Sequence, residues 1–344
     1  MTANPGGPTH GQLLRHASTR AKGLEGFGLS DLAAEVVFRL ANATAPASYA
    51  DHHHLIALLT ELRDACDDRV EVQQNRLSIV NMRNHARVLQ RCLQQHAVPL
   101  RGATHLDLGC GSINPYGRMF THLLFGAERG LCLELDPVQD MRQAVRFLAR
   151  LAGAALLDPA WVLSDAPLSR STLLANLRDV DLAKLQKGDP AGIEPRRLEL
   201  LSRPLAEAKL PVGSVQFAVS NSVLEHVVDL DAVVGELARV TAPGGYGMHG
   251  IDTSDHRRFA DPRVHALEFL TVASDEAVVH GCNRERMGQH AARFERHGFD
   301  VVDRWEETLT EVPPALRQRL AAPWASLSDA QLGMTWCILL VRRR

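Results

Sequence analysis

The chain has 344 residues, of which 45% are hydrophobic and 23% are charged, and its formal net charge is −2 at pH 7. This balance is typical of a soluble globular protein, and it argues against a protein that binds nucleic acid or anionic membranes. No apolar run approaches the roughly 20 residues that span a bilayer. The N-terminus lacks a signal-peptide core, and the six cysteines form no C-x-x-C pair. We therefore expect a cytoplasmic protein.

The first hundred residues are expected to be separate from the rest of the chain. Residues 1–20 are rich in Gly, Pro and Thr and are predicted to form a disordered leader. Apolar residues then recur at helical spacing from Leu29 to about His96. Residues 21–100 are therefore predicted to form an N-terminal helical cap.

Residues 101–344 are predicted to form an α/β domain with a mostly parallel sheet and an antiparallel last strand, because short apolar strands alternate with helices. We expect strands at Thr104–Leu108, Gly130–Leu135, Trp161–Ser164, Val215–Ser220, Gly245–Ile251, Phe299–Trp305 and Trp336–Arg342. We expect helices at Pro115–Phe125, Pro137–Ala152, Asp231–Val240 and Arg284–His297. Residues from about 166 to 210 are interpreted as a helical insertion, with helical turns at Leu173–Leu182 and Leu198–Leu201.

A glycine-rich turn follows the first strand of this domain. Gly109 and Gly111 lack the Cβ atoms that would keep a ligand away from the backbone, and Asp107 places a carboxylate beneath the turn. Cys110 lies within the turn, where it is interpreted as a small packing residue and not as a nucleophile. Glu134 ends the second strand, where a carboxylate can accept hydrogen bonds from both hydroxyls of a ribose. Together these residues favour a nucleotide-type ligand.

A third motif is the stretch Ser214–His226, which contains Ser-Val-Leu-Glu-His and is followed by Glu236-Leu-Ala-Arg239 and Pro243-Gly-Gly245. With the two preceding motifs, it resembles the class I, Rossmann-like S-adenosylmethionine-dependent methyltransferases. Within that family it is similar to a bacterial small-molecule and glycan branch. The resemblance covers residues 103–305.

The resemblance implies S-adenosylmethionine as the cofactor. Asp107, Gly109 and Gly111 would line its methionine end, Glu134 would bind its ribose, and Asp165 or an acid near Glu207 would contact adenine. The set implied to bind the cofactor is Asp107, Gly109, Cys110, Gly111, Asn114, Glu134, Asp165, Ser220, Asn221 and Ser222. The sequence departs from the family at Ile113, where a third small residue is usual.

The stretch His249-Gly-Ile-Asp252-Thr-Ser-Asp-His256 ends the predicted fifth strand, where groups that face an acceptor would lie. These side chains could orient a hydroxyl, supply a general base, hold a divalent metal or close a hydrogen-bond network. We select His226, His249, Asp252 and His256 as candidate catalytic residues and assign no metal. Asn283-Arg284 is expected to cap the last major helix or to reach an acidic acceptor.

The leading hypothesis is methyl transfer from S-adenosylmethionine to a sugar or secondary-metabolite hydroxyl or amine, by in-line displacement. One alternative is a cyclase of the same fold that closes a four-membered ring from the cofactor itself, as in azetidine-2-carboxylate, and releases methylthioadenosine. In that case Asn114, Tyr116, Ser220 and Asn221 would shape the pocket. Another alternative is an inert cofactor-binding scaffold. The expected partner is a small molecule, with neither nucleic acid nor membrane, and the sequence leaves the oligomeric state open.

Overall fold

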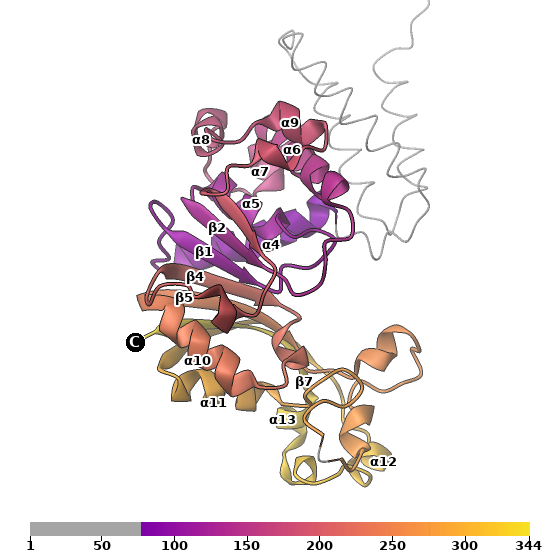
Figure 1. Cartoon of the computed structure of the whole chain (residues 1–344). Helices are drawn as coiled ribbons and strands as arrows, with labels where there is room; N and C mark the ends of the chain where they lie inside the picture. Colours follow the sequence, from indigo (N-terminus) through magenta and orange to yellow (C-terminus); the bar gives the residue numbers. More distant parts are fainter. Residues whose placement is uncertain (1–76, 275) are drawn as a thin grey trace, which may run out of the picture.

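The computed structural model describes residues 77–274 and 276–344, which form a seven-stranded sheet covered by helices on both faces (Figure 1). The predicted leader and most of the predicted cap lie outside the described residues. The strands are β1 Thr104–Leu108, β2 Arg129–Leu133, β3 Leu198–Leu201, β4 Val215–Asn221, β5 Thr241–Asp252, β6 Phe299–Leu309 and β7 Met334–Arg343. The α-helices are α4 Ile79–Gln95, α5 Gly117–Phe125, α6 Met141–Leu157, α7 Pro159–Val162, α8 Arg170–Asn176, α9 Leu182–Gln186, α10 Leu230–Val240, α11 Met287–Arg296, α12 Pro314–Arg317 and α13 Asp329–Gly333.

The strand order is β3-β2-β1-β4-β5-β7-β6. All neighbours from β3 to β5 pair in parallel, and β7 runs antiparallel to both β5 and β6. This confirms the predicted Rossmann-like sheet with an antiparallel last strand. The order reverses between β1 and β4, the position at which an open α/β sheet binds its ligand beyond the carboxyl ends of the strands.

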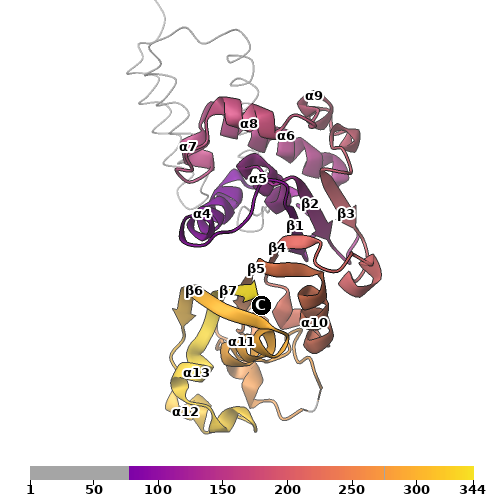
Figure 2. The same cartoon turned by 90° about the vertical axis from the view of Figure 1, so that its left-hand side faces the viewer.

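Two hydrophobic layers cover the sheet, because successive side chains of a strand point to opposite faces. Phe217 and Val219 of β4 pack with the α4, α5 and α6 side, whereas Ala218 of the same strand packs with α10 and α11. Figure 2 shows α4 to α9 on one side of the sheet and α10 and α11 on the other. A third, smaller core joins the segment after β5 to α12 and α13 through residues such as Phe269 and Trp324. Among the described residues, no helix combines the length and apolar character needed to cross a bilayer.

The third strand is the main correction to the sequence analysis. Residues 161–164, predicted as a strand, fall in and after α7, which begins where the Asp158 side chain accepts a hydrogen bond from the Trp161 N–H and Pro159 occupies the first turn. Leu198–Leu201, predicted as a helical turn, forms β3 and pairs with β2. A short leucine-rich run fits both periods, so the pairing with β2 decides its conformation. The helical insertion therefore ends before Leu198.

Three histidines connect the helical layer to the sheet. His105 of β1 donates from Nε2 to the Pro99 carbonyl at 3.0 Å, so its Nδ1 accepts from His122 Nδ1 of α5 at 2.7 Å. His122 Nε2 in turn lies 2.8 Å from His85 Nε2 of α4. Burial lowers the pKa of His105 to about 4 and the pKa of His122 well below its usual value. The three linked histidine side chains are therefore neutral imidazoles inside the fold.

Candidate functional site

The glycine turn lies at the carboxyl end of β1 and is tied to β2. The backbone N–H groups of Gly109 and Cys110 both donate to the Leu133 carbonyl, at 2.8 and 3.0 Å. Gly109 has φ +69° and Gly111 has φ +89°, a backbone conformation that favours glycine. A Cβ at Gly109 would also stand 2.4 Å from Cγ2 of Val223. The turn therefore requires glycine at position 109 for its backbone and for its packing. Cys110 is buried, in agreement with a packing role.

Asp107 lies beneath this turn and is paired with an arginine that the sequence analysis did not anticipate. Arg118 of α5 donates from Nε to Asp107 Oδ2 at 2.8 Å and from Nη2 to the Gly109 carbonyl at 3.0 Å. Burial raises the pKa of Asp107, and Arg118 opposes that shift. Asp107 Oδ1 is buried with no hydrogen-bond partner in the described part of the chain. One carboxylate oxygen thus remains able to accept a hydrogen bond from a ligand or from water.

Glu134 joins the end of β2 to the glycine turn. Its Oε2 accepts the Gly111 N–H at 2.6 Å, and its Oε1 accepts the N–H groups of Leu135 and Asp136 at 2.8 and 3.1 Å. The side chain is partly exposed. Because a carboxylate offers about four acceptor sites, Glu134 can hold the turn and still accept from a ligand hydroxyl. The structure therefore brings Asp107, Gly109, Gly111 and Glu134 together, as the spacing predicts.

Two other residues of the predicted cofactor set lie differently. Asn114 is buried and donates from Nδ2 to the sulfur of Met82 in α4 at 3.9 Å. Asp165 is exposed after α7, with φ +60°, and so does not follow a strand. The reason for choosing Asp165 as the adenine contact is therefore wrong. The chain leaves β3 at Ser202, and Glu207 lies beyond it in the exposed part of a 3-10 turn, Leu205–Ala208.

Ser220 and His249 face each other across β4 and β5. Ser220 Oγ and His249 Nδ1 are 2.8 Å apart, and both residues are buried. The His249 ring stacks on Phe294 of α11 with centroids 4.8 Å apart, and burial lowers its pKa to about 3. Asn221 is exposed, and the backbone N–H of Ser222 donates to the Gly250 carbonyl at 2.9 Å. His249 is thus a neutral core side chain, set apart from the other three candidate catalytic residues.

Those three residues gather where β4 and β5 end. His226 closes the 3-10 turn Leu224–His226, and its ring meets that of His256 edge-on with centroids 4.9 Å apart. His256 begins the 3-10 turn His256–Phe259, and its Nε2 lies 3.7 Å from Asp252 Oδ2. The structure therefore places His226, Asp252 and His256 in one cluster.

Glu225 joins this cluster, and the sequence analysis did not assign it a role. It is 1% exposed, and its Oε1 accepts the Asp252 N–H at 3.2 Å. Burial raises the pKa of its carboxyl group to about 8. Its place in the Ser-Val-Leu-Glu-His motif was the available signal, but nothing local in the sequence indicates that this carboxyl group is buried.

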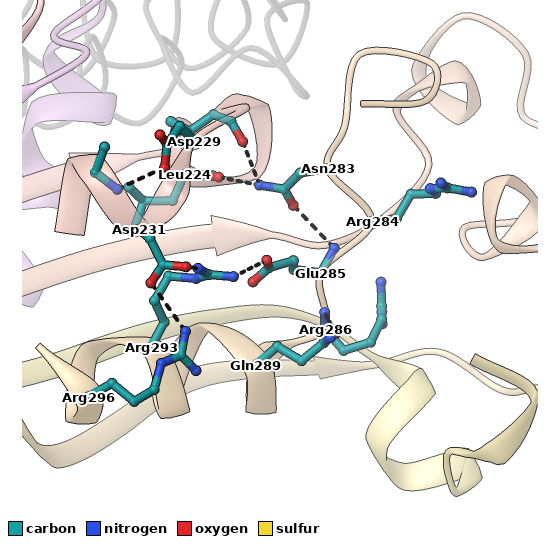
Figure 3. Close-up of polar contacts among 12 residues, drawn as sticks. Leu224, Asp229, Asp231, Asn283, Arg284, Glu285, Arg286, Gln289, Arg293 and Arg296 are labelled. Atoms are coloured by element: carbon teal, nitrogen blue, oxygen red, sulfur yellow. Dashed lines mark hydrogen bonds and ion pairs between the residues drawn. The ribbon is translucent and has the colours of Figure 1, made fainter. Parts of the chain in front are cut away.

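Asn283 and Arg284 brace this region rather than cap α11, whose N-cap residue is Arg286 (Figure 3). Asn283 donates from Nδ2 to the carbonyls of Leu224 and Val227 at 2.7 and 3.1 Å. Arg284 donates to three carbonyls of the preceding loop, those of Val272, Ser274 and Glu276. The predicted helix cap is therefore wrong. Both side chains instead satisfy backbone carbonyls of a short 3-10 turn and of loop segments.

Comparison with known proteins bears on the chemistry of this arrangement. Residues 171–248 match the family model described as a methyltransferase domain, a stretch that includes β3, β4, α10 and the first two thirds of β5 but not the glycine turn. The match supports an enzyme that uses S-adenosylmethionine as its cofactor. A search of curated proteins found no significant match.

Several solved structures are similar to this chain at low identity. One is an S-adenosylmethionine-dependent methyltransferase from Mesorhizobium loti, at 17% identity and a TM-score of 0.36, covering 74% of this chain and 96% of that chain. Another is the 1,6-didemethyltoxoflavin-N1-methyltransferase of Burkholderia thailandensis, at 13% identity and a TM-score of 0.38, covering 88% and 93%. At such identities and scores the likeness identifies no acceptor.

Proposed function

We propose that this protein transfers the methyl group of S-adenosylmethionine to a hydroxyl or amine of a small molecule. The observation that carries the proposal is the Glu134 carboxylate, held against the Gly111 N–H beside Asp107 at the carboxyl ends of β1 and β2. Glu134 would accept from the ribose hydroxyls, and the free oxygen of Asp107 would accept from the methionine amine, directly or through water. The methyltransferase-domain match supports the same reaction.

The cofactor supplies an activated methyl group on a sulfonium sulfur. During transfer the bond from sulfur to the methyl carbon breaks, the bond from that carbon to the acceptor oxygen or nitrogen forms, and the acceptor loses a proton. Alignment of the two reactants and exclusion of water are the main demands on the protein. The acceptor would lie over the ends of β4 and β5, where His226, Asp252 and His256 could orient it and take its proton.

A sugar or secondary-metabolite acceptor fits the near-neutral net charge of −2 better than a nucleic acid. We further propose that the protein acts in the cytoplasm. The histidine and carboxyl side chains of the cluster favour an acceptor with polar groups. Intramolecular cyclisation of the cofactor gains no specific support from the geometry, since Ser220 is bonded to His249 and Asn114 contacts Met82.

A product assay tests the proposal. The purified full chain is incubated with S-adenosylmethionine alone and then with a bacterial metabolite extract, and the products are identified by mass spectrometry. Adenosylhomocysteine that forms only with the extract is the expected result. Methylthioadenosine that forms without the extract would replace the proposal with cyclisation. Bound but unchanged cofactor in both incubations would favour the inert scaffold.

A further inference from the structure

Three potential metal ligands converge from three separate segments beside the proposed acceptor position. They are His226 after β4, His256 after β5 and Cys282, which ends a tight turn that begins at Val279. One ligand atom of each lies within 4.8 Å of the other two. We propose that these side chains bind a divalent transition metal ion of the zinc class. The proposal rests on the proposed function only in locating the acceptor near the site, because metal binding itself requires no methyl transfer.

His226 is held in the tautomer that a metal requires. Its Nδ1 lies 2.6 Å from the Gly281 carbonyl oxygen. A carbonyl oxygen only accepts, so Nδ1 carries the hydrogen and Nε2 carries the lone pair. Histidine ligands of metals commonly donate their second ring N–H to a backbone carbonyl or a carboxylate in this way. The residue is exposed, and its ring also meets that of His256 edge-on.

His256 and Cys282 present the other two donors from less exposed positions. Nε2 of His256 is shielded from solvent and has no hydrogen-bond partner among residues 77–274 and 276–344, although it lies 3.7 Å from Asp252 Oδ2. The Cys282 side chain is 1% exposed, and its sulfur accepts a hydrogen bond from the His256 backbone N–H. Burial raises the pKa of this thiol to about 12, and the thiol donates to the Ser254 carbonyl at 3.8 Å, so a bound metal ion would have to displace its proton.

The backbone already holds these segments in place. His280 and Gly281 both have positive φ, which gives a tight turn with hydrogen bonds between Val279 and Cys282 in both directions. The side chain of the next residue, Asn283, donates to the Leu224 carbonyl (Figure 3). Its backbone N–H donates to the Glu225 carbonyl at 2.7 Å. Cys282 is thereby fixed beside the turn that carries His226, which reduces the conformational entropy that metal binding has to overcome.

A buried carboxyl group lies beside these three side chains. The buried Glu225 carboxyl group has one oxygen, Oε2, without a hydrogen-bond partner in the described part of the chain. It interacts electrostatically with Asp252 and with Cys282, and Asp252 interacts with both His256 and Cys282.

The donor set selects the class of metal. Two imidazole nitrogens and one sulfur suit zinc, cobalt or iron(II) and disfavour magnesium and calcium, which prefer oxygen. A tetrahedral zinc site separates its ligand atoms by roughly 3.3 to 3.6 Å, so pairs of these atoms, which lie within 4.8 Å of one another, have to approach by up to about 1.5 Å. Three protein ligands leave a fourth position for water, for Asp252 or for a polar atom of the acceptor.

Cobalt binding tests the site independently of enzyme activity. The purified full chain is stripped with a chelator, titrated with Co²⁺ and followed by absorption spectroscopy, with Zn²⁺ as the competitor. We expect one tightly bound equivalent per chain, a thiolate-to-cobalt charge-transfer band and its loss on addition of Zn²⁺. Cys282→Ser should abolish that band, and His256→Gln should weaken binding at least roughly tenfold. His226→Gln should also weaken cobalt binding at least roughly tenfold, and because His226 is exposed this change should leave the fold intact.

Matched controls are Cys337→Ser, a buried cysteine of β7, and His297→Gln, a histidine paired with Asp231. Both should bind cobalt like the wild type. Binding that survives His226→Gln and Cys282→Ser, for example through the run His52–His54 of the sequence, would overturn the proposal. S-adenosylmethionine affinity, measured by calorimetry, separates the two hypotheses. If the ligand variants lose cobalt binding but keep cofactor binding, the metal site is supported whatever the product assay gives. If the wild type turns over the cofactor but binds no cobalt, only the metal site is refuted.

Discussion

The carboxylate of Glu134 accepts a hydrogen bond from the backbone N–H of Gly111 at 2.6 Å, across the gap between two neighbouring parallel strands. The Glu134 side chain therefore fixes the conformation of the glycine turn and can still accept a hydrogen bond from a ligand hydroxyl. Loss of this carboxylate removes both a contact to the turn and a contact to the proposed cofactor.

Glu134→Gln should weaken S-adenosylmethionine binding by roughly 10- to 100-fold, because hydrogen bonds to a charged acceptor contribute about 1.5 to 3 kcal/mol. Isothermal titration calorimetry measures the change. Asp136→Asn is the matched control, since this neighbouring acid is exposed and meets Glu134 only through its backbone N–H. Equal affinity of the Glu134 variant and the wild type would remove Glu134 from the site.

Gly109→Ala should destabilise the fold more than Gly102→Ala does. The two glycines have φ of +69° and +68°, so both variants pay the same backbone strain of about 1 to 2 kcal/mol. Only at Gly109 does a Cβ meet another group, Val223, and this crowding should add about 1 to 3 kcal/mol. Urea unfolding of both variants gives the difference. Combining Gly109→Ala with Val223→Ala should relieve the crowding but leave the backbone strain. Equal stability of Gly109→Ala and Gly102→Ala would contradict the packing argument.

His249→Asn should lower stability by about 1 to 3 kcal/mol and change turnover by less than roughly tenfold, because the ring lies in the core between Ser220 and Phe294. Asp252→Asn is the comparison, and there we expect the larger loss of turnover. Both are assayed with the acceptor found in the metabolite extract. A His249 variant with normal stability and a loss of several orders of magnitude in turnover would restore this histidine to the catalytic set.

Acid should destabilise the protein from about pH 6.5 downwards, because His105 and His122 are buried as neutral imidazoles. Their folded-state pKa values lie below the ordinary value of 6.5, so the unfolded chain binds more protons. The associated stability is fully present above pH 6.5 and is lost as the pH falls towards 4, by on the order of 1 kcal/mol per histidine and pH unit.

Urea midpoints at pH 8, 6 and 5 measure this loss. His105→Gln should flatten the pH dependence, because the amide can still donate to the Pro99 carbonyl but does not titrate in this range. Cys337→Ser, which changes a buried side chain of β7 whose pKa burial raises to about 11, serves as the control and should leave the slope between pH 6 and 5 nearly unchanged. A wild-type midpoint that stays constant from pH 8 to 5 would contradict the buried neutral chain.

The local residue pattern was sufficient to predict a strand or a site residue where the segment itself contains the apolar run and its closing residue. The strands at 104–108 and 215–220 and the placement of Asp107 and Glu134 at strand ends follow from apolar runs closed by glycine or by an acid. The same reasoning failed at 161–164 and 198–201. Both segments are short and apolar, and pairing with β2, which the local pattern does not contain, made one of them a strand.

The sequence by itself determined the α/β class, the glycine turn and the match to methyltransferase motifs, because each depends on residues close together in the chain. Only the tertiary structure decided that His249 lies in the core, that Arg118 meets Asp107 and that Cys282 lies beside His226. Cys282 and His226 are 56 positions apart in the chain and meet only through the hydrogen bonds of Gly281 and Asn283. Contacts of that kind depend on which strands and turns pack together, and no local period in the sequence records them.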